Sequence, residues 1–249
     1  MTAPFMRPPL VSAACEFRFM PSDKWDMTIP GLIWDLLKER YPERRQDTRL
    51  ETEIVQRPDG VEQKLTQTNW LTMFRSDEDA TVQVTQDQLL ITRGRPYPNW
   101  PIFRDEIAFA LECYDSTMTP QALVRVGLRY VNQIDIPQES IELEDYLEFY
   151  PASGKGLPDT FANFMASAEY PFGNGDAVLR LRLAPAPSPN EETTSIILDL
   201  DYFTAKPPEY GLAACSDWLE TAHARVEGAF LAAIKPTLRS LFGQEEPKS

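Results

Sequence analysis

Cysteine and histidine are scarce in this chain of 249 residues. The three cysteines are Cys15, Cys113 and Cys215, and none of them belongs to a C-x-x-C pair. An odd number of cysteines in apolar surroundings predicts buried free thiols instead of a disulfide framework or a zinc site. The only histidine is His223, so a catalytic thiol would have a single histidine to pair with.

Long apolar stretches are missing as well. No uninterrupted apolar run approaches the roughly 18 residues that a membrane-spanning helix needs. The N-terminal sequence MTAPFMRPPL has neither the apolar core nor the cleavage site of a secretion signal. We therefore expect a cytoplasmic protein that does not bind membranes.

Positive charge is in deficit, because 24 basic residues stand against 38 acidic ones and the net charge is −14. Such a chain is repelled by nucleic acids and anionic membranes, so direct nucleic-acid binding is not expected. Seventeen of the basic residues are arginines. Arginine forms planar, bidentate pairs with carboxylates. We therefore expect internal pairs of arginine with aspartate or glutamate instead of a free basic patch.

The hydrophobic pattern predicts an α+β fold, a largely antiparallel sheet with helices packed on one face. Residue alternation and turn signals indicate strands, and spacing of three to four residues indicates helices. Pro101 fits a first helical turn, and Pro236 should kink or restart the last helix. Strands are predicted at 10–19, 48–57, 61–74, 81–85, 88–93, 122–135, 160–170, 177–184 and 194–204, and helices at 32–41, 100–116, 142–149 and 213–234.

The two halves of the chain follow a similar order of elements. Residues 1–118 and 119–249 each predict a strand, a helix, a run of strands and a closing helix, and the first strands LVSAACEFRF and LVRVGLRYVN are alike. This indicates two β-α-β(3–4)-α repeats that share one sheet about a pseudo-twofold axis, within one compact unit. Chance similarity between short apolar strands is the alternative.

Arginines and aspartates recur at the same face of the predicted strands. Pairing of 177–184 with 194–204 would bring arginine opposite aspartate across the sheet. Two interpretations stay open. The residues form a solvated ladder of ion pairs, or they form a platform that binds an anion or a carboxylate. Asp199 and Asp201 alone could also hold Mg²⁺, but no further residue has metal-ligand spacing, so no metal or other cofactor is predicted. The candidate ligand-binding residues are Arg18, Arg125, Arg129, Arg180, Arg182, Asp199 and Asp201.

Aromatic residues gather in the first half of the chain. Trp70, Tyr97 and Trp100 either pack in the core or line a groove that binds a partner, and they are the candidate partner-binding residues. His223 lies within a predicted helix, near Glu220 and Glu227. Packing, a surface ion pair and a pH-sensitive role all remain open for it.

Three segments carry a resemblance that spans nearly the whole chain. They are PPLVSAACEFRF near the start, VRVGLRYVNQIDIP in the middle and LETAHARVEGAFLAAIKPTLRSLFG near the end. The chain resembles an uncharacterised, sporadically distributed prokaryotic family of roughly this length. That family has no assigned reaction, so the resemblance implies no catalytic residues. Its scattered distribution is compatible with accessory roles such as defence or toxin neutralisation.

No dinucleotide fingerprint, phosphate loop, zinc spacing or nucleophile elbow occurs in the sequence. We therefore expect a non-enzymatic binding protein that engages a protein partner, and the acidic net charge suits a basic one. Two alternatives stay open. The chain could bind a small anionic ligand, or act as an unfamiliar enzyme, through its arginine-bearing sheet face, or it could be a subunit of a homo-oligomer or larger assembly.

Overall fold

The computed structural model describes residues 5–21, 25–57, 60–152, 154, 156, 161, 163–208 and 211–243, and for 49–57, 60–69, 77 and 213 it describes the backbone. The strands are β1 Leu10–Phe19, β2 Glu43–Arg57, β3 Gly60–Arg75, β4 Ala80–Val84, β5 Gln88–Arg93, β6 Leu123–Ile136, β7 Ala166–Phe172, β8 Ala177–Ala186 and β9 Thr194–Thr204. The α-helices are α1 Ile29–Leu37, α2 Trp100–Met118, α3 Cys215–Ala233 and α4 Pro236–Leu241.

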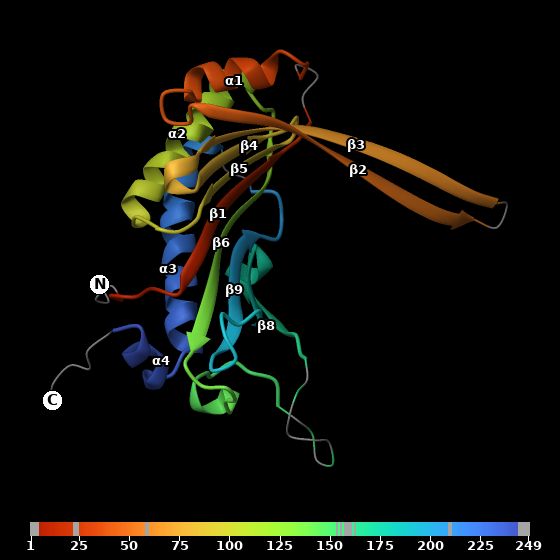
Figure 1. Cartoon of the computed structure of the whole chain (residues 1–249). Helices are drawn as coiled ribbons and strands as arrows, with labels where there is room; N and C mark the ends of the chain where they lie inside the picture. The colour runs from red at the N-terminus through yellow and green to blue at the C-terminus, as the bar shows by residue number, and fades with distance from the viewer. Residues whose placement is uncertain are drawn as a thin grey trace.

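The nine strands of the described residues belong to one antiparallel sheet, in the order β2-β3-β4-β5-β1-β6-β9-β8-β7. The helices pack on this sheet, with α2 and α3 along its helix-covered face and α1 beside α2 (Figure 1). Alternate strand residues such as Phe17, Leu128 and Leu200 are fully buried. Phe19 stacks on Tyr114 of α2 with ring centroids 4.9 Å apart. The predicted α+β fold is therefore confirmed.

The helix boundaries follow local signals in the sequence. Asn99 caps α2, because its side-chain oxygen accepts a hydrogen bond from the Ile102 amide at 3.0 Å, and Pro101 occupies the first turn. Proline has no amide hydrogen, so α3 ends at Ala233 and a separate helix α4 begins at Pro236. The predicted interruption of the last helix is confirmed.

The helix predicted at 142–149 is wrong. The chain forms only a 3₁₀ turn at Leu143–Asp145 there. Leu147 then makes a β-bridge to Ile234, and the Glu148 amide donates a hydrogen bond to the Ala233 carbonyl at 2.9 Å. These tertiary backbone bonds to the end of α3 replace the bonds of a continuing helix. The strand predicted at 160–170 is right only for its second half, because β7 covers Ala166–Phe172 and residues 161 and 163–165 are not part of a strand. Residues 160 and 162 lie outside the described part.

The internal repeat is not confirmed. β1 and β6 lie side by side at the centre, and the last strand of each half, β5 or β9, lies next to its first strand. The second half, however, has three further strands where the first has four, and between β6 and β7 the described residues form no counterpart of α1. Division into 1–118 and 119–249 stays a prediction, since both halves build one sheet.

Candidate functional site

The predicted arginines and aspartates lie together on the sheet face opposite the helices, which we call the open face. Their four strands, β1, β6, β9 and β8, are consecutive neighbours in the sheet. Successive strand residues face opposite sides. In β9, Leu198, Leu200 and Tyr202 are buried on the helix side, so Asp199 and Asp201 lie on the open face. The same alternation places Arg18, Arg125, Arg129, Arg180 and Arg182 there.

Asp199 and Arg129 form the best-aligned ion pair of the open face. The Arg129 Nε and Nη2 atoms donate hydrogen bonds to the two Asp199 carboxylate oxygens at 2.7 and 2.8 Å. The bond runs diagonally, because the residue directly opposite Arg129 is Asp201. The Asp199 side chain is 8% exposed while that of Arg129 is 49% exposed. Its hydrogen bonds with Asp199 raise the pKa of the Arg129 guanidinium.

Arg125 joins the carboxylates of two further strands. It donates to Glu16 of β1, and its Nη2 lies 3.5 Å from the Asp201 carboxylate. Arg18 forks onto the same Glu16 carboxylate at 3.0 and 3.1 Å, and Gln88 of β5 donates to it at 2.6 Å. Burial raises the pKa of Asp201, and the neighbouring Arg125 and Arg129 work against that rise.

Phe203 lies between two of these arginines. The guanidinium carbons of Arg125 and Arg180 lie 4.5 and 4.9 Å from its ring centroid. Arg180 also donates to Glu169 of β7 at 2.7 Å. Phe203 and Glu169 were missed from sequence. Phe203 continues the alternation of Asp199 and Asp201, so that signal was present, whereas finding Glu169 required the register of β7.

Arg182 is the exception on the open face. Register places it directly opposite Asp199, as the predicted pairing of the two strands requires. Both Asp199 oxygens, however, are engaged by Arg129 from the other side of β9. Arg182 is exposed, and among the described residues it has no hydrogen bond or ion pair. The ion pairs of the open face therefore form without Arg182, and its guanidinium remains available to a binding partner.

Two of the three candidate aromatic residues, Tyr97 and Trp100, lie close together, since both rings contact Phe103. Trp100 is 9% exposed, stacks on the His223 ring at 4.3 Å and donates from Nε1 to Glu220 at 3.0 Å. Tyr97 is half-buried beside it, with its ring 5.9 Å from that of Phe103. Trp70 lies in β3, and in the described part of the chain no ring contact joins it to Tyr97 or Trp100. Their role in partner binding stays a prediction.

His223 belongs to a polar chain between α3 and the sheet. The Tyr130 hydroxyl lies 3.1 Å from the Tyr97 hydroxyl and 3.0 Å from His223 Nδ1. Burial lowers the pKa of His223, and the nearby Glu227 and Glu220 oppose this. Burial also raises the pKa of Tyr97 to about 12. These groups are neutral near pH 7 and lie between α3 and the sheet. We therefore interpret this series of hydrogen-bonded side chains as structural.

The cysteine prediction is confirmed, because Cys15, Cys113 and Cys215 are free and buried. Burial raises the pKa of the Cys15 thiol well above its ordinary value and that of Cys215 to about 11. Thiols in this state are poor nucleophiles.

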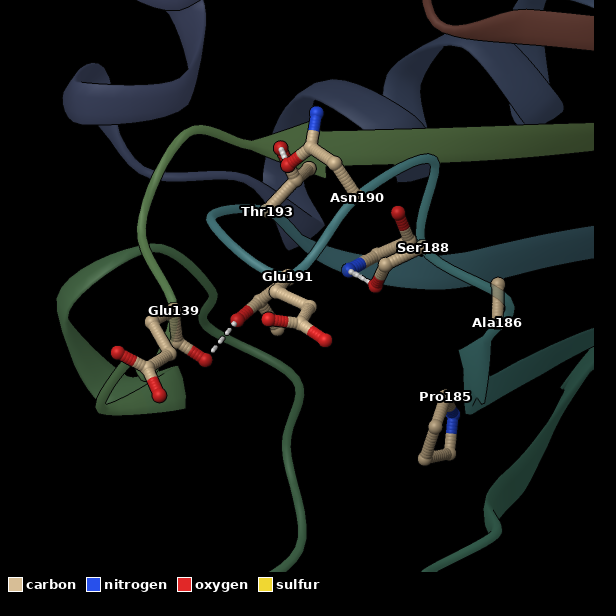
Figure 2. Close-up of a pocket in the computed structure, with 9 residues that line it drawn as sticks. Glu139, Pro185, Ala186, Ser188, Asn190, Glu191 and Thr193 are labelled. Atoms are coloured by element: carbon tan, nitrogen blue, oxygen red, sulfur yellow. Dashed lines mark hydrogen bonds between the residues drawn. The ribbon is translucent and has the colours of Figure 1, made fainter.

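Two hollows on the described surface have linings that do not include the arginines of the open face. One is shallow, holds about 550 Å³ and is lined by the β8–β9 loop and by Glu139 (Figure 2). Its charged lining residues are Glu139 and Glu191, and Thr194 donates to the Glu139 carbonyl at 3.0 Å. A second hollow holds about 290 Å³ and lies between residues such as Phe19, Leu123 and Leu212. Neither presents cations to an anionic ligand.

Within the described ranges, no three histidine, cysteine, aspartate or glutamate residues are grouped closely enough to hold a metal ion. No helix in that part of the chain is long and apolar enough to cross a membrane. Comparison with protein-family models and with curated proteins finds no match to this chain.

Proposed function

We propose that this chain is a non-enzymatic binding protein whose open face engages a protein partner, with Arg182 pairing with a carboxylate of that partner. The observation that carries the proposal is that Arg182 is exposed and has no ion pair among the described residues, at the border of a network whose other arginines are paired with carboxylates. An arginine fork binds a carboxylate with two parallel hydrogen bonds, which supplies orientation as well as attraction.

The shape of the site supports a macromolecular partner over a small molecule. Small ligands bind mostly in concave, largely enclosed pockets. The arginines instead lie across four neighbouring strands, and the two hollows described above have no arginine or lysine in their lining. A broad sheet face with fixed charges is better suited to the surface of another protein.

Local charge on the open face differs from that of the whole chain. Five arginines lie there beside the carboxylates of Glu16, Glu169, Asp199 and Asp201. The basic partner expected from the net charge therefore suits the remaining acidic surface, whereas the open face suits an acidic segment. This is why the proposal assigns a carboxylate to Arg182.

Affinity capture from the source cells with matched arginine variants tests the proposal. Arg225 is the control, because it is an exposed arginine on α3 that lies over the Phe172 ring, away from the open face. Charged hydrogen bonds contribute about 1.5–3 kcal/mol, so Arg182→Ala should reduce retention of the partner by roughly 10- to 100-fold. Arg225→Ala should retain it. Equal retention by both variants, or no partner that distinguishes them, contradicts the proposal.

A further inference from the structure

A long two-stranded ribbon extends from the sheet (Figure 1). β2 pairs with β3 along its whole length, whereas β4 pairs only with Leu71–Arg75 of β3. In the described sheet, residues 48–57 and 60–69, which we call the arm, therefore have no neighbouring strand except each other. Ten residues at about 3.3 Å each give the arm a length of roughly 33 Å.

The arm poses a physical problem, because an isolated two-stranded ribbon is at best marginally stable in water. Nothing else in the described part of the chain pairs with its strands. In the described sheet β2 is an edge strand, and the sequence has no proline from Arg49 to Arg57 that would block pairing with another strand. Contact with a further surface, beyond the two strands themselves, would therefore stabilise the arm.

Register divides the arm into an aliphatic and a charged face. Directly opposite residues share a face, and alternate residues of a strand do so as well. The pairs Thr48–Asn69, Leu50–Gln67, Thr52–Leu65, Ile54–Gln63 and Gln56–Val61 form one face, which holds four aliphatic residues and no charge. The other face holds Val55 and all six charged residues of the arm, namely Arg49, Glu51, Glu53, Arg57, Glu62 and Lys64.

The charge of the arm indicates which kind of partner it can bind. The arm has three basic and three acidic residues, whereas the chain as a whole has a net charge of −14. A balanced arm offers no attraction that selects a nucleic acid or a strongly basic protein. An uncharged aliphatic face is complementary to an identical face, as a twofold interface requires.

We propose that the arms of two copies of this chain pack together through their aliphatic faces. The length of the arm keeps the two acidic bodies apart, which limits their mutual repulsion. Two faces of ten residues each remove on the order of 1,000 Å² from water, near the lower limit for a specific interface. The dimer is therefore expected to dissociate on dilution.

Sedimentation equilibrium of the purified full chain over a wide concentration range tests the dimer. Ile54 and Val55 give a matched pair, because they are adjacent β-branched residues that register places on opposite faces. Wild type and Val55→Lys should both dimerise, while Ile54→Lys should shift dissociation to at least tenfold higher concentration. Leu65→Lys on the other strand should repeat the effect of Ile54→Lys.

Wild-type protein that stays monomeric at every concentration overturns the proposal. So does equal weakening by Ile54→Lys and Val55→Lys, which would indicate edge pairing instead of face packing. Circular dichroism of each variant checks that the body is folded. Arg182 takes no part in this measurement, so its outcome is independent of the proposed function.

Discussion

Glutamine in place of Glu106 is the sharpest test of what holds the helix layer to the sheet. Glu106 of α2 and Arg93 of β5 have side chains only 6% and 4% exposed. Arg93 Nε donates to Glu106 at 2.9 Å, and Arg75 Nη2 donates to the other carboxylate oxygen at 2.8 Å. Loss of the Glu106 charge would leave Arg93 buried with Glu78 as its remaining ionic partner.

The magnitude follows from the asymmetry of buried ion pairs. Breaking one by removing a single partner costs about 3–5 kcal/mol, because the other charge stays buried. Arg93 keeps a 2.8 Å bond to the Glu78 carboxylate and a 2.9 Å bond to the Glu78 carbonyl. We therefore expect the lower end, about 3 kcal/mol. For a chain of this size that lowers Tm by roughly 6–12 °C.

Denaturant and thermal unfolding measure this loss. Asp176→Asn is the matched control, because the Asp176–Lys206 pair has side chains 68% and 62% exposed. An exposed pair contributes at most about 1 kcal/mol. Arg93→Met combined with Glu106→Leu should recover much of the loss, since a well-packed apolar pair replaces a buried ionic one at little cost. If Glu106→Gln and Asp176→Asn cost the same, the reasoning is refuted.

The remaining predictions concern titration and thiol reactivity. Burial holds the folded pKa of His223 below its ordinary value of 6.5, so the unfolded chain takes up that proton first as pH falls. The contribution of His223 to stability should be complete above pH 6.5 and decrease as pH falls from there to the folded pKa. When the free energy of unfolding is measured between pH 5 and 8, its slope against pH should differ between wild type and His223→Gln. Parallel curves for the two proteins would refute this prediction. Cys15, Cys113 and Cys215 should resist a thiol reagent in the folded protein and react in denaturant, and rapid labelling of the native chain would contradict their burial.

The arrangement of arginines and aspartates was predictable as far as local pattern allows. Alternation assigned the face, and the expected pairing of 177–184 with 194–204 is the pairing of β8 with β9. The actual partner choice was not predictable, because Asp199 is bonded by Arg129 of β6, and the position of β6 beside β9 depends on the whole topology. Sequence alone could not show that Arg182 is the residue left over.

The buried ion pair of Arg93 and Glu106 shows a second limit of prediction from sequence. Arg93 follows Leu89 and Ile91 in the same alternation, so its position on the helix-covered face was readable from sequence. A charge there is tolerable only if a carboxylate is supplied from the covering layer. The phase of α2 against β5 decides that Glu106 supplies it, and this phase is a property of helix packing.

Both sheet faces thus neutralise arginine with carboxylate, but with opposite consequences for association. On the helix-covered face the Arg93–Glu106 pair is buried away from water, and its charges stabilise the fold only while both residues are present. On the open face the ions keep access to water, so Arg129 can exchange a water molecule for a partner group without unfolding anything. A partner that docks there meets local charge that is nearly balanced instead of the net −14 of the chain. Binding through Arg182 should therefore weaken only moderately with added salt, whereas binding driven by the total charge would fall steeply.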